Sequence, residues 1–145
     1  MNGPSEEPAG GRPDAGVAPG GEVYDWYTRG LEMLDGGDAA AAAHLLAHAS
    51  EAEPDARSIR EALARAQFVS RQYAAAADNF GRIVEEIPSD DYARFGLGLS
   101  LSRLGEYEAA VEHLALAVAM RPEKKDYVNA LRGARATLRA QERQP

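Results

Sequence analysis

The sequence lacks several features that would point to particular classes of protein. It contains no cysteine, which excludes disulfides and zinc sites built on thiolates. No run of about 18 apolar residues occurs, so no membrane-spanning helix is expected. The first 22 residues have neither a basic start nor an apolar core, unlike a secretory signal. These absences favour a cytoplasmic protein that makes no contact with a membrane.

Lysine is also scarce, and only the C-terminal end of the chain has a net positive charge. Two lysines stand against fourteen arginines, and with the frequent alanine this bias is typical of GC-rich bacterial genomes. The net charge is −7, yet residues 123–145 carry six basic and only three acidic side chains. Because the rest of the chain is strongly acidic, it repels phosphate backbones, and we expect no nucleic-acid partner.

The N-terminal 22 residues differ in composition from the rest. They hold most of the proline and glycine runs and few large apolar groups. Such a segment cannot bury enough surface to offset the entropy of ordering, so residues 1–22 are predicted to be a disordered arm. The sequence turns aromatic and aliphatic at Val23, which places the start of a single domain there, extending to residue 142.

A regular internal repeat organises this domain. Pro54, Pro88 and Pro122 are evenly spaced along the chain. Further columns repeat at the same interval, namely Gly30/Ala64/Gly98, Ala42/Ala76/Ala110, Leu46/Phe80/Leu114, Ala49/Ile83/Ala117, Gly37/Arg71/Gly105 and Ala39/Tyr73/Tyr107. Agreement of several columns at one period, about 34 residues, indicates a helical repeat protein. Its repeats are predicted over 23–56, 57–90 and 91–124.

Each repeat is predicted to contain two helices. In the third repeat, Asp90 or Asp91 caps a helix that runs to about Leu104, where Gly105 supplies a left-handed stop. A second helix follows over 107–120 and ends before the proline. The column of small residues allows close approach, and it predicts that Gly98 faces Ala110.

These columns resemble the tetratricopeptide repeat family, whose members are solenoids of helix–turn–helix units. The third repeat matches best, and the family positions are filled by Leu97, Gly98, Leu101, Gly105, Tyr107, Ala110, Leu114, Ala117 and Pro122. Departures from the family pattern are Arg29 and Ala39 in the first repeat and Gln67 and Arg71 in the second. The resemblance implies an all-α fold, a right-handed α-solenoid of three repeats plus a C-terminal capping helix.

The capping helix is predicted over 123–142. Val128, Leu131, Ala134 and Leu138 give it one apolar face, and an opposite face is crowded with arginine. A solenoid needs such a helix to cover the open side of its last repeat while facing water itself. A basic helix that docks elsewhere is the alternative.

The sequence carries no catalytic, cofactor or metal signature, and the protein is predicted not to be an enzyme. The spacing of Gly96, Gly98 and Ser100 is close to that of glycine-rich phosphate loops and nucleophile turns, but no strand precedes them and no Gly-Lys-Ser/Thr run follows. They are therefore assigned to a helix. His44 and His48, four residues apart, have no evident third metal ligand.

The family resemblance implies that a concave groove, lined by the first helix of each repeat, binds a partner protein. The groove residues carried over are Tyr24, Tyr27, Leu31, Leu34, Glu61, Arg65, Phe68, Val69, Tyr92, Phe95, Leu99 and Arg103. Most are aromatic or aliphatic, so the groove does not resemble the family's carboxylate clamps. It is predicted to be apolar with a polar centre at Glu61 and Arg65. Packing into the core is the alternative for Leu31, Leu99 and Val69.

Two functions remain open at this stage. The first is a protein-binding scaffold or adaptor whose apolar groove takes a peptide or helix of another protein. The second is a self-associating structural protein, a homo-oligomer or a chain whose groove is filled by its own N-terminal arm or by a second copy. Nothing in the residues names the partner.

Overall fold

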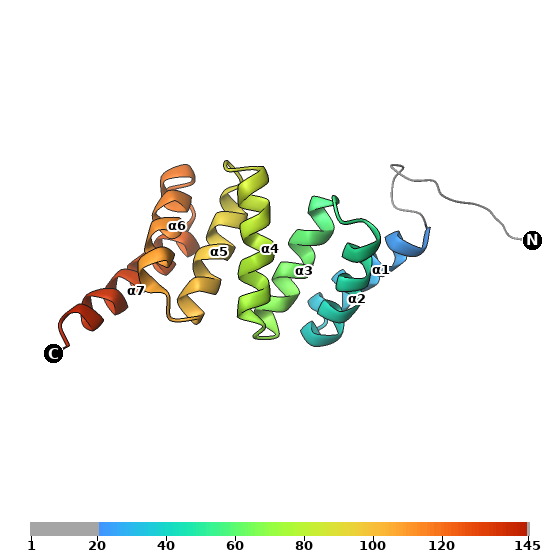
Figure 1. The fold of residues 1–145 in the computed structure, drawn as a ribbon, viewed down its shortest axis with the longest axis horizontal. Helices are drawn as coiled ribbons and strands as arrows, with labels where there is room; N and C mark the ends of the chain where they lie inside the picture. The colour runs from blue at the N-terminus through green and yellow to red at the C-terminus, as the bar shows by residue number, and fades with distance from the viewer. Residues whose placement is uncertain (1–20, 145) are drawn as a thin grey trace, which may run out of the picture. The chain divides into compact units, whose positions relative to one another are not determined.

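The computed structural model describes residues 21–144 and folds them entirely into α-helices joined by short turns (Figure 1). The helices are α1 (Gly21–Asp35), α2 (Ala39–Ala52), α3 (Arg57–Val69), α4 (Tyr73–Glu86), α5 (Asp91–Arg103), α6 (Tyr107–Met120) and α7 (Lys125–Glu142). Helix α1 begins two residues before Val23, the predicted start of the domain. The remainder of the predicted disordered arm, residues 1–20, lies outside the described residues.

The helices follow the period seen in the sequence. Helices α2, α4 and α6 start at Ala39, Tyr73 and Tyr107, and helices α3, α5 and α7 start at Arg57, Asp91 and Lys125. Each of these steps equals the interval that separates successive members of the sequence columns. The predicted all-α helical-repeat fold is therefore confirmed.

The turn inside each repeat has the same geometry despite a change of residue. Gly37 and Gly105 have φ of 92° and 83°, and Arg71, which replaces glycine in the second repeat, has φ of 69°. In the second repeat the amide of Gln72 donates to the carbonyl of Gln67, and the first and third repeats form the equivalent bond. This is the Schellman closure of a helix C-terminus. A side chain in the left-handed region costs about 1 kcal/mol, and the closure holds Arg71 there.

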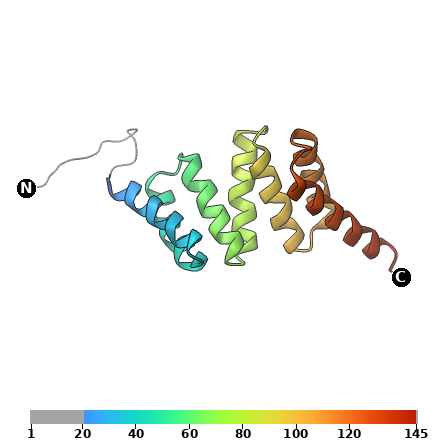
Figure 2. The same ribbon diagram turned by 180° about the vertical axis from the view of Figure 1, so that it is seen from behind.

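The described chain divides into two compact units, one ending at Ala66 and the other beginning at Gln67. In the first unit, α1 packs on α2, and α2 packs on the part of α3 that belongs to this unit. The buried core there consists of Ala42, Ala43, Leu46, Ala62, Leu63 and Ala66. In the second unit, α5 packs against α4 and α6, and α7 packs against α6 and α5; both views show α6 beside α7 (Figures 1 and 2).

Close helix contacts depend on glycine in both units. A Cβ atom built on Gly30 would lie 2.6 Å from Cγ of Leu46, and one built on Gly98 would lie 2.6 Å from Cγ of Leu114. Real Cβ atoms are not found at such distances, so a side chain at either position would force the neighbouring leucine to shift. Gly98 does approach the backbone of Ala110, as predicted, but its principal neighbour is Leu114.

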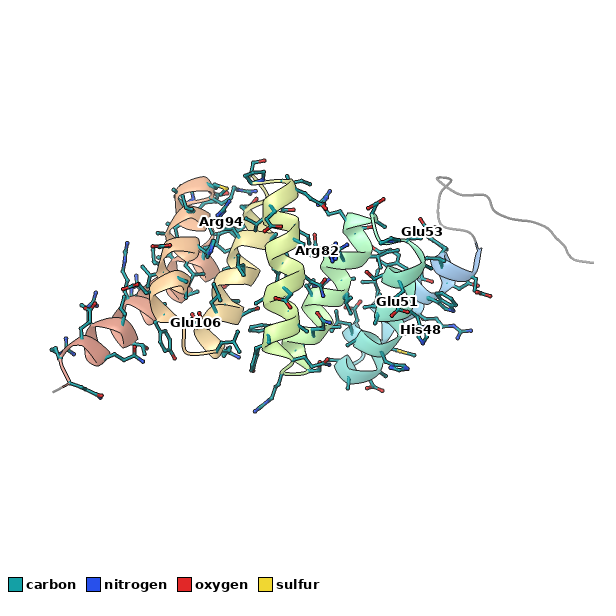
Figure 3. The ribbon with its side chains drawn as sticks, viewed as in Figure 1. His48, Glu51, Glu53, Arg82, Arg94 and Glu106 are labelled. Carbon is teal, nitrogen blue, oxygen red and sulfur yellow. The ribbon has the colours of Figure 1, made fainter. Side chains whose placement is uncertain are left out.

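Two arginines brace the loops between repeats. Arg60 Nη2 donates to the carbonyl of Pro54 at 2.5 Å, and Arg94 Nη2 donates to the carbonyl of Pro88 at 3.0 Å. The two donors share one column of the repeat pattern, as do the two acceptors, so each unit contains one copy of the same bond. Figure 3 labels Arg94 on α5. This pair was not predicted from the sequence, although the two arginines recur at the repeat period.

The first testable prediction concerns the glycine column. Gly98→Ala should lower the free energy of unfolding by about 1–3 kcal/mol, because its methyl group collides with a fully buried leucine. Gly133 is the matched control, since it lies in α7 with nothing within 4 Å of a built Cβ. Gly133→Ala should raise stability by up to about 1 kcal/mol through helix propensity. Chemical denaturation of both variants measures this, and an equal effect of the two changes would contradict the packing described here.

A second prediction concerns pH and His113. Burial lowers the pKa of this half-buried imidazole below its usual 6.5, and the nearby Arg94 guanidinium lowers it further, while Glu112 opposes the shift. Arg94 Nη1 lies 3.3 Å from Nδ1 of His113, and Nδ1 accepts a hydrogen bond from it when the ring is neutral with its hydrogen on Nε2. The unfolded chain therefore binds more protons than the folded chain between the folded pKa and about 6.5, so stability falls on acidification through that window.

His113→Gln should remove this part of the pH dependence. Unfolding free energies measured at pH 7.5 and at several values down to pH 5 should decline less steeply for the variant than for the parent chain. Identical slopes for the two chains would show that the protonation state of His113 is not linked to folding.

Candidate functional site

The residues that resembled a catalytic loop are part of the helix packing. Ser100 is fully buried in α5, and its Oγ donates to the carbonyl of Gly96 at 2.8 Å. A Cβ atom on Gly96 would lie 2.5 Å from the ring of Phe80, so this glycine also permits a close contact. The serine hydroxyl is therefore shielded from any substrate by the surrounding helices.

The two histidines of α2 form a surface pair without further ligands. His44 and His48 are exposed with ring centroids 5.4 Å apart, and the His48 ring lies 6.0 Å from that of Trp26. Among residues 21–144, no group of three His, Cys, Asp or Glu side chains is arranged to hold a metal ion. Within the same range, no helix has the length and apolarity needed to cross a membrane.

The groove residues of the first unit combine core packing with exposure. Tyr24 is 54% exposed. Three others on α1, namely Tyr27, Leu31 and Leu34, are half-buried and pack against the core of that unit. Glu61 and Arg65, the predicted polar centre, are half-buried on α3. The structure thus gives most of these side chains contacts that contribute to folding.

The groove residues of the second unit are more open. Val69 is 59% exposed and Tyr92 is 36% exposed. Phe68, Phe95 and Leu99 are half-buried. Core packing is the alternative to a groove position for Leu31, Leu99 and Val69. Val69 lies mostly in solvent, whereas Leu31 and Leu99 are partly covered.

Arg103 is held in place by two aromatic rings. Its guanidinium carbon lies 5.0 Å from the centroid of Phe68 and 5.7 Å from that of Tyr73. Its Nη1 donates to Oη of Tyr73 at 3.2 Å, and the two rings meet edge to face at 5.3 Å. No carboxylate among the described residues forms an ion pair with this guanidinium. The arginine is exposed and pre-positioned, with donors directed to solvent.

A row of aromatic rings connects the groove residues of α5 to α7. Tyr92 contacts Phe80 at 6.2 Å and Phe95 at 6.4 Å between ring centroids. Phe95 in turn stacks on Tyr127 of α7 at 4.5 Å, with an angle of 27° between the rings. The ring of Phe95 is therefore covered on one side by the terminal helix, so it supports the fold as well as lining the surface.

Tyr127 is the buried anchor of this row. Its hydroxyl donates to Oδ2 of Asp91 at 2.6 Å. Burial, together with this hydrogen bond, raises the pKa of the Tyr127 phenol well above its usual value. The predicted apolar face of the terminal helix begins at Val128 and does not include Tyr127. The signal was present, because position 127 precedes Leu131 by four residues and so lies on the same helix face.

The third prediction separates rings that stabilise the fold from rings left in solvent. Phe95→Ala should lower the free energy of unfolding by about 2 kcal/mol or more, because it removes the stacking partner of Tyr127. Tyr24→Ala is the control and should change it by about 0.5 kcal/mol or less, as at other surface positions. Thermal or urea unfolding of both variants provides the measurement. A cost at Tyr24 as large as that at Phe95 would contradict the burial described above.

Comparisons with known proteins agree with this architecture. The family model described as tetratricopeptide repeat matches residues 27–91 and 62–125. Among solved structures, the first tetratricopeptide domain of Spaghetti (RPAP3), bound to the HSP90 peptide SRMEEVD, has 19% sequence identity and a TM-score of 0.74. That match covers 81% of this chain and 93% of the other. The comparison with curated proteins gave no match.

Two further structures extend the likeness. The C-terminal tetratricopeptide domain of an FK506-binding protein of Plasmodium falciparum has 17% identity and a TM-score of 0.77, over 85% of this chain and 92% of that one. MamA from MSR-1 has 21% identity and a TM-score of 0.74, over 83% of this chain and 69% of that one. Since the family model covers most of the described helices, this chain belongs to the tetratricopeptide repeat family.

Proposed function

We propose that this chain is a non-enzymatic adaptor whose groove residues bind a peptide or helix of a partner protein. The observation that carries the proposal is the arrangement at Arg103, whose guanidinium rests over Phe68 and Tyr73 with no ion pair to satisfy it among the described residues. Val69 follows Phe68 in the chain and leaves 59% of its surface in solvent. An oriented cation next to exposed apolar surface is what a peptide-binding surface requires.

The geometry favours binding because the side chains are already ordered. Fixing an arginine in one rotamer normally costs entropy on association, and here the two rings have fixed it in the unbound chain. Arginine and tyrosine are also the side chains that most often dominate the energetics of interfaces. Arg103 and Tyr92 are therefore the residues on which we expect binding in the second unit to depend most strongly.

The partner chemistry follows from the lining. Apolar side chains of the partner would cover Val69 and Tyr92, and a backbone carbonyl or a carboxylate would accept from Arg103. The complex of the Spaghetti domain with its HSP90 peptide supports the use of this fold for peptide binding. In this chain the lining is mainly aromatic and aliphatic, which favours a partner recognised mostly through apolar contacts.

Site-specific photo-crosslinking tests where a partner binds. A photoreactive phenylalanine analogue at Val69 or at Tyr92 should give a defined crosslinked product in lysate of the source cells. The matched control is Leu116 on α6, which is also apolar and 48% exposed. Crosslinking at Leu116 but not at the two groove positions would place binding elsewhere and overturn the proposal.

The fourth prediction is quantitative. Once the crosslinked partner is identified, Tyr92→Ala and Arg103→Ala should each weaken its binding by about 1–2 kcal/mol, which is roughly a factor of ten. Arg103 is exposed, so Arg103→Ala should change the free energy of unfolding by less than about 1 kcal/mol, whereas Tyr92→Ala also removes two ring contacts and should cost about 1–2 kcal/mol. Calorimetric titration and denaturation of the same samples separate the two effects. Wild-type affinity in both variants would remove these residues from the binding surface.

The self-associating alternative is tested independently of any partner. Sedimentation velocity of the full chain and of a version lacking residues 1–22 gives the mass of each. The adaptor proposal expects a monomer in both cases. A larger species that disappears with Tyr92→Ala would mean that the groove residues bind a second copy.

A further inference from the structure

The exposed side of α7 forms a second surface, distinct from the groove residues. A shallow cavity of about 300 Å³ lies between side chains of this one helix. Its lining residues, here called the arginine face, are Val128, Leu131, Arg132, Arg135 and Arg139. Leu131 is only 7% exposed, so it lies at the base of the cavity, and the three exposed arginines form the walls.

The repeat columns show what this side of α7 corresponds to. Arg132 stands one full repeat after Gly98, and Arg135 stands one full repeat after Leu101. In α5, Gly98 contacts Leu114 of α6, and Leu101 packs against the same core cluster. The arginine face of α7 therefore corresponds to the side of α5 that packs against α6.

Arg132 limits how closely another helix can pack on this side of α7. A Cβ atom at Gly98 would lie 2.6 Å from Leu114, so even a methyl group there requires the leucine to shift. A long arginine in the same column prevents a helix from settling as closely on α7 as α6 settles on α5. Any helix bound here would sit farther out, with polar groups directed at the arginines.

The charges on this face are unsatisfied within the described residues. Arg132 donates to Oδ1 of Asn129 at 3.2 Å. The side chains of Arg135 and Arg139 form no hydrogen bond or ion pair with any residue that the structure describes. The three guanidinium groups start from positions spaced by three and four residues, so they follow one side of the helix over about 10 Å.

We propose that the arginine face docks an acidic amphipathic helix from a partner protein. Carboxylates at three- and four-residue spacing on that helix would meet the guanidinium groups, and an apolar side chain between them would enter the cavity above Val128 and Leu131. The docked helix takes the position that a following repeat helix would occupy, displaced outward by Arg132. This surface works independently of the groove residues proposed above.

Charge complementarity selects this occupant over other anionic surfaces. The apolar residues lie beneath the arginines rather than beyond them, so they cannot insert into a lipid bilayer. Residues 23–122 carry sixteen acidic and nine basic side chains, so a nucleic acid would be repelled by the rest of the molecule. A helix with carboxylates can reach the arginines while presenting a small contact area to the acidic repeats.

The experiment uses a synthetic peptide as the probe. It is a fluorescein-labelled 18-residue helix with glutamates at three- and four-residue spacing around a line of leucines, and a scrambled peptide of the same composition is the comparison. Fluorescence anisotropy with the full chain should detect binding of the patterned peptide only. Arg135→Glu should weaken that binding about tenfold or more.

Arg29→Glu supplies the matched control. Arg29 is an exposed residue of α1 in the first unit, and its substitution changes the net charge by the same amount. It should leave peptide affinity within a factor of two. A patterned peptide carrying lysine opposite position 135 should recover binding to the Arg135→Glu chain. Circular dichroism melts of both variants confirm that each is folded.

Several outcomes would overturn the proposal. Equal loss of binding in Arg29→Glu, or equal binding of the scrambled peptide, would mean that only net charge attracts the probe. An Arg135-dependent dimer of the chain without peptide would make a second copy the occupant. Binding to phosphatidylglycerol vesicles that is lost in Arg135→Glu, with no peptide binding, would make the face a lipid contact.

Discussion

The close approach of paired helices at glycine is the constraint on which the remaining structure depends. Gly30 and Gly98 leave no room for a Cβ atom, and Leu46 and Leu114 fill the space that results. Because those leucines are fully buried, each pair has one permitted spacing. That spacing sets which side chains of the first helix in a pair face inward and which remain on the surface.

Features that recur at the repeat period could be predicted from the sequence. Contacts that depend on the direction of individual side chains could not. The repeat period, the helix pairs and the glycine turns were all readable, since they recur along the chain. The stacking of Phe95 on Tyr127 was not, because it occurs once and joins helices of different repeats. Likewise, the ring that covers Gly96 belongs to Phe80 on another helix, and no local pattern identifies it. The twelve groove residues were located by family position, which carries no information on how much of each side chain neighbouring helices cover.

The groove residues contribute to folding to different extents in the two units. In the first unit, three groove residues pack against the core, namely Tyr27, Leu31 and Leu34. Substituting them is therefore expected to lower the stability of the fold more than it affects recognition. In the second unit, Val69 lies mostly in solvent, and Arg103 is exposed with its guanidinium over Phe68 and Tyr73. The arginine face of α7 is a further exposed surface, and its charge is opposite to that of the repeats before it.

The hydrogen bond between Tyr127 and Asp91 has a consequence for how the molecule opens. In a solenoid each unit contacts only its neighbours, so a terminal unit can open separately if its contacts are few. Tyr127 reaches past α6 to the first turn of α5, so α7 is tied to both helices of the preceding repeat. Fraying of α7 therefore requires the loss of a contact to α5 as well as to α6. Backbone amides of the last three helices should then exchange with solvent as one cooperative group rather than in order from the C-terminus.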